Sequence, residues 1–330
     1  MDPSTKQKLE ELRSDYEIVN GRPFSHFYCP ILFRDEDVGL CQGHIVNRAF
    51  PGSSRAWIVQ REDVDNFFGS IFEGAFVDVQ PAEKVAPDQV MIDAELSKKL
   101  RPAICIGGRV VEHFVAVGPV PNHFAEVVLG GPSGTVRLGL KMHPDEASAA
   151  LGNGCQILID RDLRLPALVS VLKAAHLTLF RMLGYRYALS AGGIFLGWTV
   201  LGDFFLRNKS RGRAEVLANA ASHFRDFANM ARPVLSAPTE VQGTVSDHFL
   251  LVCRYGDTPW AMIVFVRTSD QLHAALVPVL DEPSSADRFV KFLRGEGGPI
   301  QANRCRFEGE KFLGAKESET FIWPEGRFEG

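Results

Sequence analysis

The most apolar stretch of the chain, residues 165–207, restricts the possible folds more than any other segment. Its first half has apolar residues at helical spacing, interrupted by Lys173, His176 and Arg181, and its second half carries no charge from Tyr187 to Gly202. A membrane-spanning helix needs about 20 apolar residues, so this uncharged run is short for that purpose. We expect a buried pair of helices or a helical seam between two subunits, since its glycines allow close packing. A membrane segment in a membrane-associated protein is the alternative.

Runs rich in β-branched residues dominate the sequence from about residue 88 to residue 165, including VMIDAEL at residues 90–96. Glycine, proline and asparagine turns separate these runs, which predicts a small, mostly antiparallel sheet. One helix is expected within it, at residues 144–152. A longer amphipathic helix is expected at residues 213–232, followed by further strands.

The C-terminal region ends the pattern of strands with one more predicted helix. Ser285 is placed to cap that helix, because a serine side chain can accept the first free backbone N–H groups. The last segment, residues 299–330, is polar and is expected to be loosely attached.

Together these elements predict an α+β protein in three segments. Residues 1–80 would hold an N-terminal helix and a compact module, residues 81–165 a β-rich segment, and residues 166–330 an α/β segment that packs with 81–165 as one domain. A chain of 330 residues can hold two or three domains. Its formal charge of −4 does not exclude nucleic acid, because binding a polyanion requires only a local basic face.

The cysteines and the N-terminus indicate a reducing compartment. None of the six cysteines forms a CxxC pair, so no ordinary zinc motif is present. Cys29 and Cys41 are the two candidate ligands of a structural zinc, although two buried thiols are the favoured interpretation. The N-terminal residues are charged throughout and do not resemble a secretory signal. We therefore expect a cytoplasmic protein with free thiols.

Residues 27–76 carry most of the chemical information in the sequence. His44 follows a strand-like run within GHIVNRAF, and Asn66 lies near the start of a predicted helix in DVDNFFGS. A strand-borne imidazole facing a helix-borne amide is typical of a compact one-metal nuclease site. The imidazole takes a proton from water, and the amide oxygen helps to hold a divalent ion on the scissile phosphate.

These two segments resemble the HNH endonuclease family, whose active site is a ββα-metal fold. The resemblance covers about residues 29–76 and implies that His44 is the general base and Asn66 a ligand of Mg²⁺ or Mn²⁺. Gly43 stands where the family has an acidic metal ligand, and Trp57 stands where it has the asparagine that orients the base. The resemblance therefore implies a nuclease fold in which part of the usual site is replaced.

Other residues near the motif are candidates for the missing acidic ligand. Asp63, Asp65 and Glu73 can each offer the hard oxygen that magnesium and manganese prefer. Glu73 lies seven residues after Asn66, which is about two helical turns along the same face.

Two groups of basic residues are candidates for binding phosphates. Arg48 and Arg61 flank the predicted site and could hold neighbouring phosphates of a nucleic acid. The most basic loop of the chain follows the apolar stretch and contains Arg207, Lys209, Arg211 and Arg213. We interpret it as a phosphate clamp, with a solvated loop as the alternative.

The sequence thus predicts a metal-dependent endonuclease that acts on nucleic acid, with DNA favoured over RNA, and that forms a homodimer. A role as an effector of bacterial defence is suggested only by how HNH modules are commonly deployed. The alternative is a binding or sensing protein that keeps the ββα scaffold without catalysis.

Overall fold

The computed structural model describes residues 2–50, 56–80, 85–131, 134–151, 155–159, 164–231, 239–240, 249–255, 258–268, 271–294, 296, 300–308 and 311–321. Helices and antiparallel strands make up the fold, which confirms the predicted α+β class. The chain divides into two compact units: unit 1 contains residues 1–74 and 164–330, and unit 2 contains residues 75–163. The N-terminal segment therefore shares a unit with the C-terminal segment, whereas the sequence pattern had paired residues 166–330 with 81–165.

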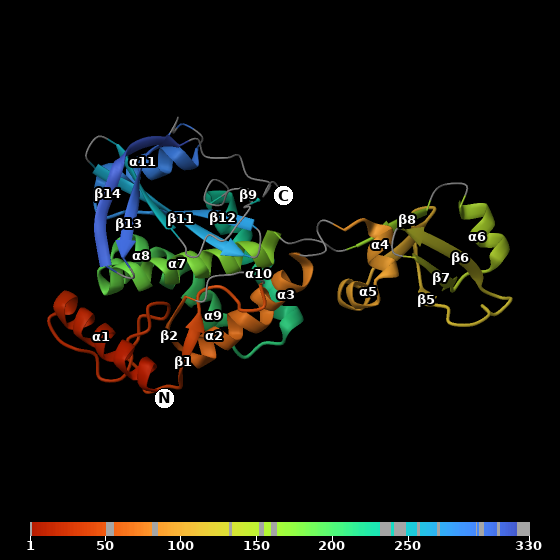
Figure 1. The fold of residues 1–330 in the computed structure, drawn as a ribbon, viewed down its shortest axis with the longest axis horizontal. Helices are drawn as coiled ribbons and strands as arrows, with labels where there is room; N and C mark the ends of the chain where they lie inside the picture. The colour runs from red at the N-terminus through yellow and green to blue at the C-terminus, as the bar shows by residue number, and fades with distance from the viewer. Residues whose placement is uncertain are drawn as a thin grey trace. The chain divides into compact units, whose positions relative to one another are not determined.

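Unit 1 begins with a helix, a hairpin and a second helical segment (Figure 1). These are α1 (Pro3–Asn20), β1 (Leu40–His44), β2 (Trp57–Arg61), α2 (Glu62–Phe68) and the π-helical turn η1 (Gly69–Glu73). Asp2 caps α1, because its side chain accepts hydrogen bonds from the backbone N–H groups of Ser4 and Thr5. The hairpin strands are antiparallel and pair Leu40 with Arg61 at one end and His44 with Trp57 at the other.

After unit 2, the chain returns to unit 1 as a series of helices and then forms a sheet. The helical elements are α7 (Arg164–Ala188), α8 (Ala191–Ile194), the π-helical η3 (Phe195–Gly202), α9 (Asp203–Asn208) and α10 (Arg213–Ala231). The sheet has the order β14-β13-β10-β11-β12-β9. Its strands are β9 (Thr239–Glu240), β10 (Phe249–Tyr255), β11 (Thr258–Thr268), β12 (Gln271–Pro278), β13 (Ile300–Glu308) and β14 (Lys311–Phe321), with α11 (Pro283–Leu293) between β12 and β13.

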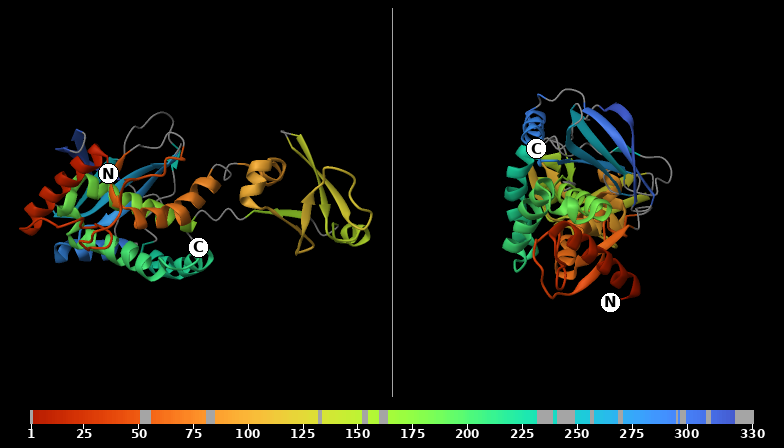
Figure 2. Two further views of the ribbon diagram at one scale, coloured as in Figure 1. Left: turned by 90° about the horizontal axis from the view of Figure 1, so that it is seen from below. Right: turned by 90° about the vertical axis from the view of Figure 1, so that its left-hand side faces the viewer.

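Helix α7 is the centre of unit 1. It contacts β11 and β12 of the sheet and, from the N-terminal segment, α1 and η1. Figure 2 shows the same order of layers, with α7 between the sheet and the N-terminal elements. Within the described part of the chain, Leu165–Ala188 is long and apolar enough to cross a membrane, but 72% of its apolar window is buried. This burial is what the core helix of a soluble protein shows.

Two features explain how the apolar stretch packs. Gly184 interrupts α7 with φ 61° and ψ −149°, a conformation that favours glycine, and Asp15 accepts a hydrogen bond from the freed N–H of Tyr185 at 2.6 Å. Gly197 of η3 packs against the carbonyl oxygen of Pro30, which a Cβ atom would approach to 2.6 Å. The glycines predicted to allow close packing therefore do so within one chain.

Unit 2 contains two small antiparallel sheets, β4-β3-β8 and β5-β7-β6. Its core includes Met91, Ile104 and Leu138. Its strands are β3 (Ala103–Ile106), β4 (Arg109–Val111), β5 (His113–Val115), β6 (Ala125–Gly131), β7 (Gly134–Leu140) and β8 (Cys155–Leu158). Its helices are α3 (Gly74–Val79), α4 (Pro87–Ile92), α5 (Ala94–Leu100) and α6 (Pro144–Leu151), and α3 begins at the last residue of the first part of unit 1.

Three local predictions were wrong. Residues 90–96 form parts of α4 and α5 instead of a strand, because Pro87 starts the first helix and the Asp93 side chain caps the second. Ser285 does not cap α11, since its hydroxyl donates to the carbonyl oxygen of Pro259. Within residues 299–330, the described part forms β13 and β14 of the main sheet instead of a loose tail.

Candidate functional site

His44 is the last residue of β1 and is half-buried. Its Nε2 accepts a hydrogen bond from Nε of Arg48 at 2.6 Å, so the imidazole is neutral and carries its proton on Nδ1. Burial and the nearby Arg48 cation lower the pKa of His44, although Asp65 opposes this effect. His44 is therefore a neutral base at the end of a strand, with Trp57 as its cross-strand neighbour.

Asp65 and Glu73 meet at the ammonium group of Lys173. Nζ of Lys173 lies 2.8 Å from Oδ1 of Asp65 and 2.8 Å from Oε1 of Glu73. Burial alone would lower the pKa of Lys173, but the two carboxylates outweigh it and raise that pKa. Burial raises the pKa of Glu73, against the opposing effect of Lys173. The result is a buried cation shared by two acidic side chains.

The π-helical turn η1 explains why Glu73 joins Asp65. In a regular α-helix, a residue eight positions later lies about 80° away around the axis, since each residue advances the helix by about 100°. A π-helical turn has i→i+5 hydrogen bonds and turns less per residue, which reduces this offset. Glu73 therefore shares a face with Asp65, and the predicted alignment of Glu73 with Asn66 is lost.

The remaining predicted metal ligands lie elsewhere. Asn66 is exposed on α2. Asp63 forms a two-pronged pair with Arg61, with N–O distances of 3.0 and 2.9 Å. The same guanidinium also binds Glu36, and its side chain is only 6% exposed. Arg61 is thus a buried structural cation, which corrects the prediction that it holds a phosphate.

Asn47 anchors the loop that carries Arg48. Its side-chain amide donates to Glu73 and helps to offset the rise in the pKa of that carboxyl. Its side-chain oxygen also accepts from the backbone N–H of Ala49 at 2.9 Å. The loop after His44 is therefore tied to the Asp65–Lys173–Glu73 cluster.

The basic loop follows α9 and lies close to the start of α2. The ring of Phe67 packs on those of Phe204 and Phe205. Hydrogen bonds from Arg61 lower the pKa of Asp63, and Lys209 adds to this effect, which places the Lys209 charge nearby.

The basic residues of this loop remain accessible. Arg207 pairs with Asp203 and Arg211 pairs with Glu215, but these are exposed pairs that contribute little to stability. Arg213 is exposed at the start of α10. The structure therefore leaves the basic loop free to exchange its ion pairs for phosphates.

The candidate zinc ligands are protonated thiols. Burial raises the pKa of Cys29 to about 11 and that of Cys41 to about 12, with Asp65 adding to the second shift. Sγ of Cys29 accepts from the N–H of Leu32 at 3.4 Å, and Sγ of Cys41 lies 3.9 Å from Oδ2 of Asp65. In the described ranges, no group of three histidine, cysteine, aspartate or glutamate side chains is arranged to hold a metal ion.

Two residues, one in the cluster and one in the hairpin, were missed by the sequence reasoning as site residues. Lys173 is a charged residue in an otherwise apolar helical stretch, which is a visible signal of a buried ion pair. Gln60 is a polar residue inside the strand WIVQR, opposite Cys41 in the hairpin. Its side chain is 3% exposed and lies in the space next to Gly43.

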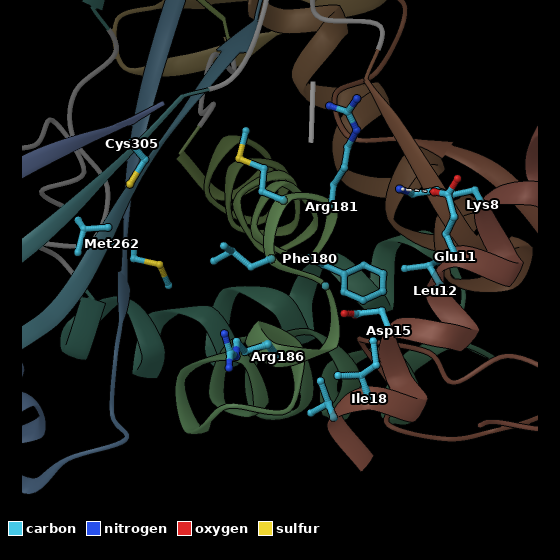
Figure 3. A pocket seen from close by; sticks show the side chains of 15 residues that line it. Lys8, Glu11, Leu12, Asp15, Ile18, Phe180, Arg181, Arg186, Met262 and Cys305 are labelled. Atoms are coloured by element: carbon cyan, nitrogen blue, oxygen red, sulfur yellow. Dashed lines mark hydrogen bonds and ion pairs between the residues drawn. The ribbon is translucent and has the colours of Figure 1, made fainter. Parts of the chain in front are cut away.

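A separate hollow of about 920 Å³ lies between α1, the break in α7 and the sheet (Figure 3). Figure 3 shows Leu12 and Asp15 on one side and Met262 and Cys305 on the other. Three of its charged side chains have local partners: Lys8 pairs with Glu11, and Asp15 accepts a hydrogen bond from the N–H of Tyr185. Among the described residues, the lining includes no histidine that could serve as a neutral imidazole for proton transfer.

Comparisons with models of protein families, with curated proteins and with solved structures give no match for this chain. Its function must therefore be inferred from the site itself.

Proposed function

We propose that β1, β2 and α2 form the centre of a metal-dependent endonuclease in which His44 is the general base. The observation that carries this proposal is the neutral, half-exposed imidazole of His44, which accepts a hydrogen bond from Arg48 and is close enough to Asp65 for that carboxylate to affect its pKa. A general base must be unprotonated at cellular pH. In a nuclease, positive charge near the base is also needed to hold the phosphate.

The proposed reaction uses groups that are already adjacent. Arg48 is exposed, so an incoming phosphate can take its guanidinium away from His44. Nε2 of His44 then accepts a proton from the water whose oxygen attacks the phosphorus. The bond from phosphorus to the leaving oxygen breaks, and that oxygen takes a proton from solvent. Arg48 thereby both binds the substrate and frees the base.

Magnesium or manganese fits the donor set at Asp65. One oxygen of Asp65 is held by Lys173, but the side chain remains 25% exposed. Magnesium is commonly held by one or two carboxylates together with waters and substrate phosphates. When bound, the ion would supply positive charge to the phosphate and the leaving oxygen. In this proposal Asn66 and Asp63 are not ligands, because Asn66 is exposed on α2 and Asp63 is paired with Arg61.

Nucleic acid, with DNA favoured, is the proposed substrate. Arg48 and Lys209 are exposed cations that lie near enough to His44 and Asp63, respectively, to lower the pKa of each. A backbone that spans them would place a phosphate beside His44. Cutting both strands of DNA together would require two active sites and therefore two copies of the chain. For this reason a homodimer remains part of the proposal.

A second candidate is the binding protein that keeps this scaffold without catalysis. It is favoured by Lys173, whose ammonium already binds two carboxylates that could otherwise hold a divalent ion. In that case the basic loop would bind a polyanion, and His44 would have only a structural contact with Arg48.

One experiment separates these two candidates. Purified protein is incubated with plasmid DNA and with RNA, with Mg²⁺ or Mn²⁺ against a chelator. We expect metal-dependent cleavage that falls by about 10²–10⁴-fold in His44→Ala, the usual contribution of a general base. His143→Ala, at an exposed histidine of unit 2, is the control and should cut like the wild type. Unchanged cleavage in His44→Ala would remove His44 from the mechanism, and binding without cleavage would support the second candidate.

A further inference from the structure

Gln60 is a buried polar side chain whose hydrogen-bonding capacity is unused. Within the described residues, neither Nε2 nor Oε1 of its amide has a hydrogen-bond partner, and the side chain is 3% exposed. Buried polar groups are almost always hydrogen-bonded, because an unsatisfied one loses its interactions with water without replacement. An amide left in this state indicates a partner that the protein chain does not provide.

The position of this amide is set by Gly43. A Cβ atom on residue 43 would overlap the Gln60 amide, so any side chain at this position would displace it. Cys41 pairs with Gln60 and Gly43 with Ile58, which places Cys41, Gly43 and Gln60 on one face of the hairpin. The amide of Gln60 therefore occupies the space beside the residue that precedes His44.

Asp65 approaches the same face from α2. Oδ2 of Asp65, the oxygen that does not bind Lys173, lies 3.9 Å from Sγ of Cys41. Because Cys41 is also the cross-strand partner of Gln60, its side chain is the common neighbour of the carboxylate and the amide. The side chains of Asp65 and Gln60, which both carry oxygen donors, therefore lie beside Cys41 on the face of the hairpin that also carries Gly43.

We propose that Gln60 is a neutral oxygen ligand of the divalent cation, delivered from β2 into the space that Gly43 leaves open. This inference rests on the proposed function, since it concerns the same site. An amide oxygen suits magnesium and manganese as a carboxylate does. It adds no further negative charge to a cluster in which one ammonium already pairs with two acidic side chains. Gln60 thus takes the place of an acidic side chain at residue 43.

The direct test is Gln60→Leu, which keeps the volume of the side chain and removes the amide. Mn²⁺ binding is measured from the electron paramagnetic resonance signal of the free ion, and stability from thermal unfolding. We expect the Mn²⁺ affinity to fall by at least about tenfold, while the unfolding temperature stays the same or rises, since a buried unsatisfied group has been removed. An unchanged Mn²⁺ affinity, or no Mn²⁺ binding by the wild type, would overturn the proposal.

Gln42→Leu is the matched control in the same hairpin. Gln42 lies on the opposite face, where its amide donates to Asp2, Ser4 and Thr5 at the start of α1. This variant should lose some stability and keep its Mn²⁺ affinity. A loss of affinity equal to that of Gln60→Leu would show that the hairpin, and not the Gln60 amide, determines binding.

A second variant keeps the proposal testable if Gln60→Leu fails to fold. Gly43→Asp combined with Gln60→Ala restores an acid at residue 43 and removes the amide that would clash with it. We expect Mn²⁺ binding at least as tight as in the wild type, and weaker binding in Gln60→Ala alone. If the double variant binds no better than Gln60→Ala, the two positions are not interchangeable and the proposal fails.

These outcomes are distinguishable from failure of the proposed function. Mn²⁺ binding that depends on Gln60 in a protein that cuts nothing would retain the site and reject the nuclease. Cleavage that depends on His44 but is unchanged in Gln60→Leu would retain the nuclease and reject this ligand.

Discussion

Two buried polar regions lie three residues apart on α7 and differ in how completely the chain satisfies them. His176 donates through Nε2 to the carbonyl oxygen of Pro30 and accepts at Nδ1 from the hydroxyl of Tyr187, both at 3.0 Å. Lys173 binds two carboxylates, but the surrounding cluster opens to solvent at Asp65 and His44. A buried polar group whose hydrogen bonds are all made within the chain has a structural role. A polar group that solvent can reach, or that has no hydrogen-bond partner, is available to bind a ligand.

The same contrast distinguishes two histidines, His176 and His44. Burial lowers the pKa of His176 to about 4, and no solvent reaches its ring. His44 is neutral as well, but its hydrogen-bond donor is an exposed arginine that can leave. Access to a substrate, and not the protonation state, distinguishes the candidate base from the core histidine.

The largest effect is expected from removing the buried cation. Lys173→Met leaves the buried Glu73 carboxyl without its cation, so the free energy of unfolding should fall by about 3–5 kcal/mol. Denaturant unfolding measures this change. Lys291→Met, at an exposed pair with Asp287, is the control and should change stability by less than about 1 kcal/mol. A Lys173→Met protein as stable as the wild type would contradict the importance of this pair.

A somewhat smaller effect is expected from acid. His176 has a pKa of about 4 when folded and 6.5 as its ordinary value, so the unfolded chain binds more protons between these pH values. Its contribution to stability is complete above pH 6.5 and is lost as the pH falls toward 4, by about 3 kcal/mol.

The measurement is urea unfolding of the wild type and of His176→Gln between pH 7 and pH 4.5. The variant should be less stable at pH 7 but should lose less stability with acid. Burial also lowers the pKa of His273 to about 4, so His273 makes the same pH-dependent contribution to stability in both proteins. Parallel pH profiles would mean that His176 is not held neutral by the fold.

The smallest effect is expected from replacing Arg48, the exposed arginine that is hydrogen-bonded to His44. Arg48→Gln should weaken DNA binding and reduce the slope of log affinity against log salt by about 1, because one phosphate contact is lost. Fluorescence anisotropy at several salt concentrations measures both. Arg186→Gln, at an exposed arginine of the separate hollow, should leave the slope unchanged. If the wild type, Arg48→Gln and Arg186→Gln all show the same salt slope, Arg48 does not contact the DNA.

Local patterns were sufficient to predict much of the fold. The helix at Pro144–Leu151, the helix at Arg213–Ala231 and the strands of both units follow from periodicity and turn residues that act over a few positions. The position of His44 at a strand end was also readable. Where a cap or an N-terminal proline competed with an apolar run, as at residues 87–100, the local signal favoured the wrong element.

The candidate site was harder to predict because its partners are distant in sequence. Lys173 reaches Asp65 across 108 residues, and no spacing rule connects them. Glu73 joins them only because a π-helical turn shifts the register of one helix, which residue periodicity does not reveal. Gln60 could be recognised only from the space beside Gly43, which requires the register of the hairpin.

The insertion of unit 2 between the two parts of unit 1 has a consequence for synthesis in the cell. Asp65 leaves the ribosome 108 residues before Lys173, which corresponds to about 5–20 s at typical translation rates. During this interval the acidic side chains of the nascent chain have no ammonium partner and must remain hydrated. The proposed catalytic centre is therefore completed only after the intervening unit has been made, so a truncated translation product would carry the motif without a finished site.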